Sequence, residues 1–238
     1  MTMNIQDDRG FNQVWGDSKA TRVRTERRCD MMLDAMELGR PVSILEIGCG
    51  LGSNAYFMAS KTGMEVLGVD LCRPFIEEAQ RRYPLPNLSF KALDFNRPDD
   101  LTAGQYDYVV GNGILHHLYQ DLDKALLNIR RLLKPGGKLI FFEPNVSNPY
   151  VFLIFRVPPL RKVAHLEPDE MAFSKWYAMD VLRNAGFGNI HVEFKDFLLP
   201  GIPEFLIQPS INAGRMLERL PLLRTLSQSL LIQGTRHS

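Results

Sequence analysis

The sequence predicts an α/β fold with a mostly parallel sheet and helices on both faces. Between residues 42 and 142, short apolar runs alternate with helical patterns, which is typical of parallel strands joined by right-handed crossovers. The first run ends in closely spaced glycines, and the next two runs end in an acid. Ligands of an open parallel sheet bind beyond the carboxyl ends of its strands, so these features predict a site at that edge.

The composition describes an ordinary globular protein. The 238 residues fit one large domain, and 28 Lys and Arg against 27 Asp and Glu give no general basis for nucleic-acid binding. No run of about 18 apolar residues predicts a transmembrane helix, and residues 1–10 lack a signal-peptide core. The three cysteines, Cys29, Cys49 and Cys72, are too few and too widely spaced to predict a disulfide framework or a zinc motif. We therefore expect a cytoplasmic protein.

Local patterns predict each element in turn. The residues before Pro41 have the pattern of two helices, 17–26 and 29–38. The segment 133–137, Leu-Lys-Pro-Gly-Gly, predicts a helix end and a turn into a strand, because proline and paired glycines cannot continue a helix. The expected strands are 42–47, 65–70, 88–93, 106–113, the run after 137, 190–197 and 227–234.

The glycine turn after the first strand carries the strongest functional signal. Gly48, Gly50 and Gly52 stand at alternate positions, where missing side chains let a ligand lie against the backbone. A dinucleotide-binding turn needs G-x-G-x-x-G, and here Ser53 occupies the position of the third glycine. Glu46 precedes the turn, where an acid would disfavour a diphosphate. The turn therefore favours a ligand other than a dinucleotide.

Asp70 ends the second strand, about 22 residues after the first glycine of the turn. An ionised carboxylate at this place can accept hydrogen bonds from both hydroxyls of a ribose. Dehydrogenases share this device, so Asp70 indicates a nucleoside-bearing cofactor without identifying it. The alternative is an ordinary turn or capping acid before the helical pattern at 74–79.

Further segments match one known family in order and spacing. The pattern E-I-G-C-G-x-G at 46–52, the D-x-V-V-x-x-x-x-L-H-H segment at 107–117 and the L-K-P-G-G segment at 133–137 lie within residues 42–145. Together they resemble class I S-adenosylmethionine-dependent methyltransferases of the small-molecule kind. The resemblance implies a Rossmann-like, seven-stranded sheet whose last strand is antiparallel, and S-adenosylmethionine as the cofactor.

The resemblance also implies a set of cofactor-binding residues at the strand ends. A carboxylate such as Glu46 suits a cationic sulfonium, Asp94 would contact the adenine amino group, and Phe95 would cover the ring. Asn112 would present its amide or carbonyl at the reaction centre. The full set is Glu46, Gly48, Cys49, Gly50, Gly52, Asn54, Asp70, Leu71, Asp94, Phe95, Asn112 and Gly113.

The family resemblance also predicts the domain organisation. We expect an N-terminal helical cap at 1–40 and a methyltransferase domain at 41–238, with insertions at about 144–173 and 198–225. Such insertions act as lids that exclude water and shape the acceptor pocket. The core segments therefore indicate the cofactor, whereas the acceptor depends on the insertions.

Two surface features allow more than one interpretation. The apolar run 151–155, followed by basic residues, could rest on anionic lipid, but its length and the prolines after it favour packing onto the domain. Arg24, Arg27 and Arg28 could hold an anionic group on one side of a helix, and a solvated helix face is the favoured interpretation.

The histidines could act in catalysis or hold a metal, or they could have a purely structural role. His116 is a candidate general base, while the adjacent His117 should point about 100 degrees away on a helix, so the pair does not predict a metal site. His165 lies near Glu167, Asp169 and Glu170, a group that favours a solvated acidic loop over a metal site. No metal is expected.

The predicted function is methyl transfer from S-adenosylmethionine to a small-molecule acceptor, which can be linked to a glycan or a lipid. A base is needed only if the acceptor arrives protonated. The alternatives are an RNA or protein methyltransferase, a nicotinamide-dependent oxidoreductase and a non-catalytic binding protein with the same fold. The sequence leaves the oligomeric state open.

Overall fold

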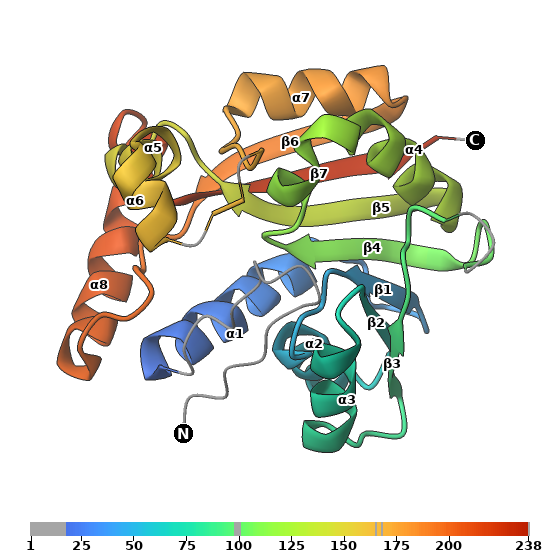
Figure 1. The fold of residues 1–238 in the computed structure, drawn as a ribbon. Helices are drawn as coiled ribbons and strands as arrows, with labels where there is room; N and C mark the ends of the chain where they lie inside the picture. Colours follow the sequence, from blue (N-terminus) through green and yellow to red (C-terminus); the bar gives the residue numbers. More distant parts are fainter. Residues whose placement is uncertain (1–17, 98–100, 165, 168, 238) are drawn as a thin grey trace.

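The computed structural model describes residues 18–97, 101–164, 166–167 and 169–237. One seven-stranded sheet runs through it in the order β3-β2-β1-β4-β5-β7-β6 (Figure 1). Strands β1 to β5 pair in parallel, and β7 is antiparallel to both β5 and β6. The predicted Rossmann-like fold class is therefore confirmed. The strands are β1 (Ser43–Ile47), β2 (Glu65–Asp70), β3 (Leu88–Ala92), β4 (Tyr106–Asn112), β5 (Leu133–Pro144), β6 (Phe187–Lys195) and β7 (Ser229–Arg236).

Helices cover both faces of the sheet and form two apolar cores. On one face α4 and α7 bury side chains such as Leu126 and Leu182, and on the other α1, α2 and α3 bury Met32, Met58 and Ile76. Figure 1 shows α4 and α7 above the sheet and α1 to α3 below it. The α-helices are α1 (Lys19–Asp34), α2 (Ser53–Thr62), α3 (Arg73–Arg82), α4 (Leu122–Leu132), α5 (Pro149–Arg156), α6 (Pro158–Val163), α7 (Lys175–Asn184) and α8 (Glu204–Leu217), and the 3₁₀ helices are η1 (Leu115–Asp121) and η2 (Leu223–Leu226).

The alternation of side chains along β1 explains why the sheet has two cores. Leu45 and Ile47 are fully buried in the α4 and α7 core, whereas Ile44 joins the opposite core. Successive side chains of a strand point to opposite faces, so a strand that is apolar at nearly every position must be covered on both.

Two sequence predictions about the elements are wrong in detail. The helices predicted at 17–26 and 29–38 form one helix within the described residues, α1, whose N-cap Ser18 accepts a hydrogen bond from the Thr21 amide. The stretch between the two predicted helices contains no glycine or proline to interrupt it. The predicted turn at 133–137 lies inside β5, where Gly136 has φ 79 and the pairing with β4 shifts register.

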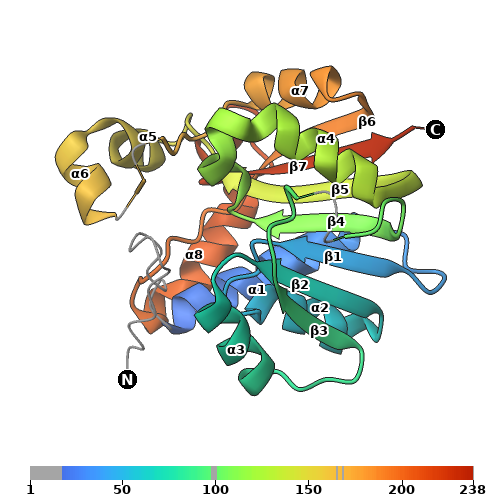
Figure 2. The same cartoon turned by 45° about the vertical axis from the view of Figure 1, so that its right-hand side comes forward.

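The two predicted insertions contain short helices at the carboxyl-end side of the sheet. The segment 144–173 holds α5 and α6, which project from the domain in Figure 2, and 198–225 holds α8 and most of η2. The domain boundaries themselves stay a prediction. Among the described residues, no helix combines the length and hydropathy needed to cross a membrane.

Candidate active site

The glycine turn between β1 and α2 places three glycines in different roles. All three have positive φ, which favours glycine over any other residue. A side chain on Gly48 would meet Ile114 at 2.5 Å, and one on Gly52 would meet Phe90 at 2.5 Å. Gly50 has nothing within 4 Å of the same position. Gly48 and Gly52 therefore allow close packing, and Gly50 leaves an open stretch of backbone that a ligand can approach.

Asp70, at the end of β2, organises this turn. Its Oδ2 accepts a hydrogen bond from the Gly50 amide at 2.9 Å, and its Oδ1 accepts one from the Cys72 amide at 2.9 Å. The carboxylate therefore ties the glycine turn to the loop after β2. The role of Asp70 toward ribose hydroxyls stays a prediction. Leu71 follows with 61% of its surface exposed.

Glu46 lies behind the turn, where it is 2% exposed. Its Oε1 accepts a hydrogen bond from Asn54 Nδ2 at 2.9 Å, while Oε2 and Asn54 Oδ1 are buried without a hydrogen-bond partner. Burial raises the pKa of Glu46 to about 8. The predicted pairing of Glu46 with a cationic sulfonium requires a charged carboxylate. This buried environment favours the neutral acid unless a cation binds nearby.

Cys49 contributes its backbone to the turn. Its amide donates to the Val69 carbonyl at 3.0 Å, and its side chain is buried in the core that α1, α2 and α3 cover. Burial also raises the pKa of the thiol well above its ordinary value. The thiol is therefore a packing group.

Asp94 and Phe95 follow β3 at the same edge. Asp94 Oδ1 accepts a hydrogen bond from the Asn96 amide at 2.9 Å, which closes a local turn and leaves the carboxylate half-buried. Phe95 is 7% exposed and packs in the core with α4. The structure thus gives Phe95 a core position, and the adenine roles of both residues stay predictions.

A buried arginine network holds the end of β4. Arg28 of α1 donates from Nη1 to Asn112 Oδ1 at 2.9 Å and from Nε to Asp196 Oδ2 at 2.8 Å. It also donates to Ser229 Oγ, and its guanidinium lies 5.1 Å from the ring centre of Phe142. Arg28 is 5% exposed, so the interpretation of a solvated helix face is wrong for it.

Asp196 is the anionic centre of that network. Burial alone would raise its pKa, but the nearby charges of Arg28 and Arg24 outweigh burial and lower the pKa below the ordinary value. Arg24 Nε also donates to Asp196 Oδ2 at 3.2 Å, and burial lowers the pKa of Arg24 to about 9. Sequence analysis did not identify Asp196, because it lies 168 residues from Arg28.

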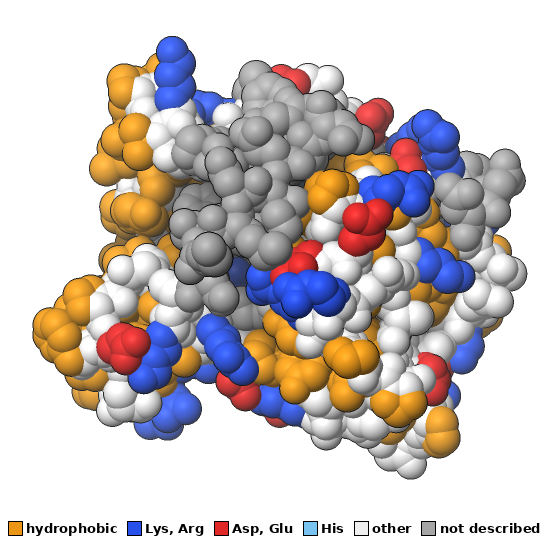
Figure 3. Space-filling model, turned by 60° about the horizontal axis from the view of Figure 1, so that its bottom comes forward, with side chains coloured by type: hydrophobic (Ala, Val, Ile, Leu, Met, Phe, Trp, Pro, Cys, Tyr) orange, Lys and Arg blue, Asp and Glu red, His pale blue; other side chains and the backbone are white. Residues whose placement is uncertain are grey.

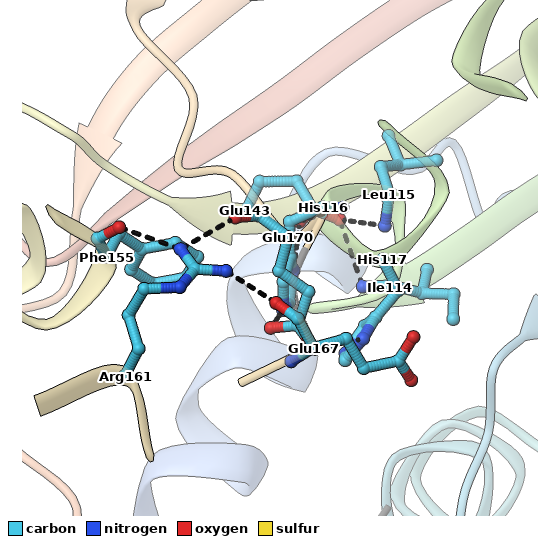
Figure 4. Close-up of polar contacts among 9 residues, drawn as sticks. All are labelled: Ile114, Leu115, His116, His117, Glu143, Phe155, Arg161, Glu167 and Glu170. Carbon is cyan, nitrogen blue, oxygen red and sulfur yellow. Dashed lines mark hydrogen bonds and ion pairs between the residues drawn. The ribbon is translucent and has the colours of Figure 1, made fainter. Parts of the chain in front are cut away.

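Glu143, at the end of β5, fixes the position of His116 (Figure 4). Its Oε1 accepts hydrogen bonds from the amides of Ile114 and Leu115 at 3.1 and 2.7 Å. Its Oε2 accepts from the His116 amide at 3.2 Å and lies 2.8 Å from His116 Nδ1. Glu143 is 1% exposed and caps the start of η1. Because Nδ1 is used by Glu143, Nε2 is the ring nitrogen of His116 that can act on a ligand.

His117 and Glu170 form a cluster with His116, in which Glu170 lies near both histidines. His117 Nδ1 lies 2.8 Å from Glu170 Oε1, and His116 Nε2 lies 3.8 Å from Glu170 Oε2. The two imidazole rings are 4.2 Å apart, so the expectation that they diverge is wrong. Both rings lie near the same carboxylate, that of Glu170. Burial lowers the pKa of His117, but its hydrogen bond to Glu170 outweighs that effect and raises it.

Glu170 is 2% exposed, so the interpretation of a solvated acidic loop is wrong for this residue. His165 lies outside the described residues. His116, His117 and Glu170 bring ligand atoms within 4.8 Å of one another, and are the described group that could hold a metal ion. The hydrogen bond between His117 and Glu170 accounts for their approach without an ion.

A cavity of about 420 Å³ lies against this cluster. Arg161 supports its wall by donating from Nη1 to the carbonyls of Phe155 and Glu170, at 2.7 and 3.2 Å, and from Nη2 to the Glu167 carbonyl. Figure 4 shows these bonds beside His116. The cavity is lined by Tyr119, Gln120, Val146, Phe155, Arg156, Arg161, Asp169, Glu170, Met171 and Ala172.

The fold and the site together define an α/β protein that binds a nucleoside-bearing ligand at the carboxyl edge of a parallel sheet. Residues 45–139 match a family model described as a methyltransferase domain. The chain belongs to the class I S-adenosylmethionine-dependent methyltransferase family, whose cofactor is S-adenosylmethionine. This assignment decides against the nicotinamide alternative.

Curated relatives match part of their own length. The chain is 29% identical over 178 residues to an S-adenosyl-L-methionine-dependent Diels-Alderase of Talaromyces variabilis, which covers 69% of the chain and 59% of the relative. It is 32% identical over 217 residues to the highly reducing polyketide synthase NEC1 of Pyricularia oryzae. The aligned region covers 77% of this chain and 8% of the relative. The chain thus spans less than two thirds of these relatives.

Solved structures share the fold at low sequence identity. The CurJ carbon methyltransferase matches with a TM-score of 0.63 at 19% identity, covering 94% of this chain and 57% of that one. A possible histamine N-methyltransferase from Thermotoga maritima matches with a TM-score of 0.62 at 17% identity, covering 92% and 90%. The two neighbours carry different acceptor atoms in their descriptions, so the shared fold leaves the acceptor atom open.

Proposed function

We propose that this chain transfers a methyl group from S-adenosylmethionine to a protonated site, a hydroxyl or an acidic carbon, on a small-molecule acceptor. The observation that carries the proposal is the pair of His116 and Glu143, 2.8 Å apart, with His116 also 3.8 Å from Glu170, which lines the cavity. This pair supplies a base in a family whose other essential contribution is alignment of the acceptor.

The residues at the strand ends fit the cofactor. Gly50 leaves an open backbone, Asp70 offers a carboxylate at the end of β2, Asn112 ends β4 and Gly113 follows it. When bound, the cofactor supplies an electrophilic methyl group on a sulfonium. The protein then has to position the acceptor, and proximity and orientation can contribute about 7 to 11 kcal/mol to a displacement.

His116 is suited to receive the acceptor's proton. Its Nδ1 faces Glu143 Oε2, so a proton on Nδ1 fixes the tautomer and leaves the lone pair of Nε2 for the acceptor. After Nε2 takes the proton, the buried carboxylate of Glu143 stabilises the imidazolium. A general base of this kind contributes about 10²- to 10⁴-fold to a rate.

The acceptor would bind in the cavity beside this pair. Its volume of about 420 Å³ falls in the usual range for small-molecule sites. Apolar residues such as Phe155, Val146 and Met171 line it together with Arg156 and Glu170, which suits an acceptor with an apolar body and polar groups. The names of relatives such as the polyketide synthase NEC1 and the cyclopropane-fatty-acyl-phospholipid synthase of Escherichia coli support this class.

Conversion of S-adenosylmethionine to S-adenosylhomocysteine tests the proposal, with separate pools of metabolites, lipids and glycans, RNA, and protein as acceptors. We expect turnover in the metabolite or lipid pool, a loss of about 10²- to 10⁴-fold for His116→Ala, and loss of cofactor binding for Asp70→Ala. His191→Ala, an exposed histidine on β6, is the matched control. Turnover confined to RNA or protein would refute the acceptor class. Cofactor binding without turnover in any pool would favour a non-catalytic protein.

A further inference from the structure

The exposed large hydrophobic side chains gather in two segments. Of the 17 in the described residues, 13 lie in 149–163 and 199–226. We name these two segments the exposed helical face. Several side chains are far more open than packing would leave them, with Phe205 at 76%, Val163 at 77% and Leu222 at 84%. The members are Tyr150, Phe152, Leu153, Leu160, Val163, Leu199, Phe205, Leu206, Met216, Leu220, Leu222, Leu223 and Leu226.

Both segments are anchored to the domain, so this exposure belongs to the folded protein. Ile207 and Ile211 of α8 pack with Ala20 of α1 in a small buried cluster. Asn148, which caps α5, donates from Nδ2 to the Leu226 carbonyl at 2.6 Å and so joins the two segments. In Figure 1 the helices α5, α6 and α8 lie at the side to which the arrowheads of β4 and β5 point.

The exposed charges of this face are mostly positive. Five basic residues in the two segments are exposed, against one exposed acid, Glu204, which forms an ion pair with Lys19 at 2.8 Å. The whole chain has a net charge of only +1, so positive charge is concentrated here. The left side of Figure 3 shows hydrophobic side chains with blue Lys and Arg among them. The exposed basic residues are Arg156, Lys162, Arg215, Arg219 and Arg224.

We propose that the exposed helical face binds the anionic surface of a lipid membrane. Aromatic and aliphatic side chains enter the boundary between headgroups and acyl chains, while Arg and Lys contact the lipid phosphates. Several exposed apolar side chains on separate helices, bordered by cations, suit a broad and chemically uniform surface. The apolar run at 151–155, interpreted from sequence as packing, exposes Phe152 and Leu153 for this purpose.

This face adjoins the cavity. Phe155 and Arg156 of α5 line the cavity, and α5 also carries the exposed Phe152 and Leu153. A membrane-bound domain would therefore present its cavity close to the lipid surface. This consequence rests on the proposed function and narrows the acceptor to a lipid or lipid-linked molecule, whereas binding of the face to lipid does not depend on methyl transfer.

Vesicle co-sedimentation tests the proposal without any substrate. The whole chain is mixed with vesicles of phosphatidylcholine alone or with added phosphatidylglycerol, and the pelleted fraction is measured. We expect binding that requires phosphatidylglycerol and weakens as salt is added, since salt screens exposed charges. The triple variant Phe152→Ser, Phe205→Ser, Leu222→Ser should bind the vesicles with an affinity lower by about tenfold or more. Arg215→Glu with Arg219→Glu should lose the preference for phosphatidylglycerol.

The matched control replaces exposed hydrophobic residues elsewhere. Leu127→Ser with Trp176→Ser changes side chains that are 54% and 71% exposed on α4 and α7, and should leave binding unchanged. Thermal unfolding of every variant should match that of the unaltered chain. Absence of binding to either vesicle would refute the proposal, as would a dimer in solution that the triple variant dissociates. Vesicle binding without turnover would refute the proposed function alone.

Discussion

Replacing Arg28 with leucine should strongly destabilise the domain, because it leaves the buried carboxylate of Asp196 with one arginine partner in place of two. The side chains of Arg28 and Asp196 are 6% and 1% exposed, and Nε and Oδ2 are 2.8 Å apart. Breaking a buried ion pair by removing one partner costs about 3 to 5 kcal/mol. Arg24 stays 3.2 Å from the same oxygen, so we expect a loss near the lower end, about 3 kcal/mol.

Urea unfolding followed by circular dichroism measures this loss as a fall in the free energy of unfolding. Arg22→Leu, on an exposed position of the same helix, is the control and should change stability by less than about 0.5 kcal/mol. The double variant Arg28→Leu, Asp196→Leu should recover part of the loss, since it removes the uncompensated charge. An Arg28→Leu variant as stable as its control would refute the reasoning that this pair carries buried charge.

Four further predictions follow from the site. Gly52→Ala should destabilise the domain more than Gly50→Ala, since only the former places a methyl group 2.5 Å from Phe90, and urea unfolding compares the two. Burial raises the pKa of Glu46 from 4.5 to about 8, so between these pH values the folded protein holds a proton that the unfolded chain releases. The free energy of unfolding should therefore fall as the pH rises from about 4.5 to 8. Glu46→Gln should remove most of this pH dependence. Glu170→Gln weakens the contact with His117 and should raise the KM for the acceptor while calorimetry shows unchanged cofactor affinity. Turnover should survive EDTA, because the proposed base is an imidazole. Loss of activity restored by zinc or manganese would instead assign a metal to His116, His117 and Glu170.

Sequence patterns predict the glycine turn and the strand ends of the fold well because these parts are local. The glycine turn and the acid that ends β2 each depend on residues within a few positions of one another. Once alternating strands and helices predict a parallel sheet, these segments must meet at one edge. The seven strands of the sheet and the antiparallel β7 agree with what the family resemblance implies.

The rest of the site depends on contacts between distant segments. Glu143 reads in the sequence as the end of a strand, and its role appears only when η1 turns its amides toward it, 27 to 29 residues away. Arg28 resembles any arginine on a polar helix until Asp196 closes over it from the end of β6. Hydrophobic patterns also fail for Phe152 and Phe205, because their exposure depends on which neighbours the fold supplies.

The division between cofactor and acceptor determinants has a structural cause. The residues predicted to bind the cofactor lie on the first four strands, in the loops after them or, for Asn54, on α2, where the fold itself fixes the geometry. The base candidate His116 lies between the two regions, since Glu143 of the sheet holds its Nδ1 and Glu170 of the insertion lies 3.8 Å from its Nε2. An acceptor that reaches Nε2 must therefore pass between the sheet and the insertion. The insertion helix α5, which lines the cavity and exposes Phe152 and Leu153, then decides both what enters and from which surface it comes.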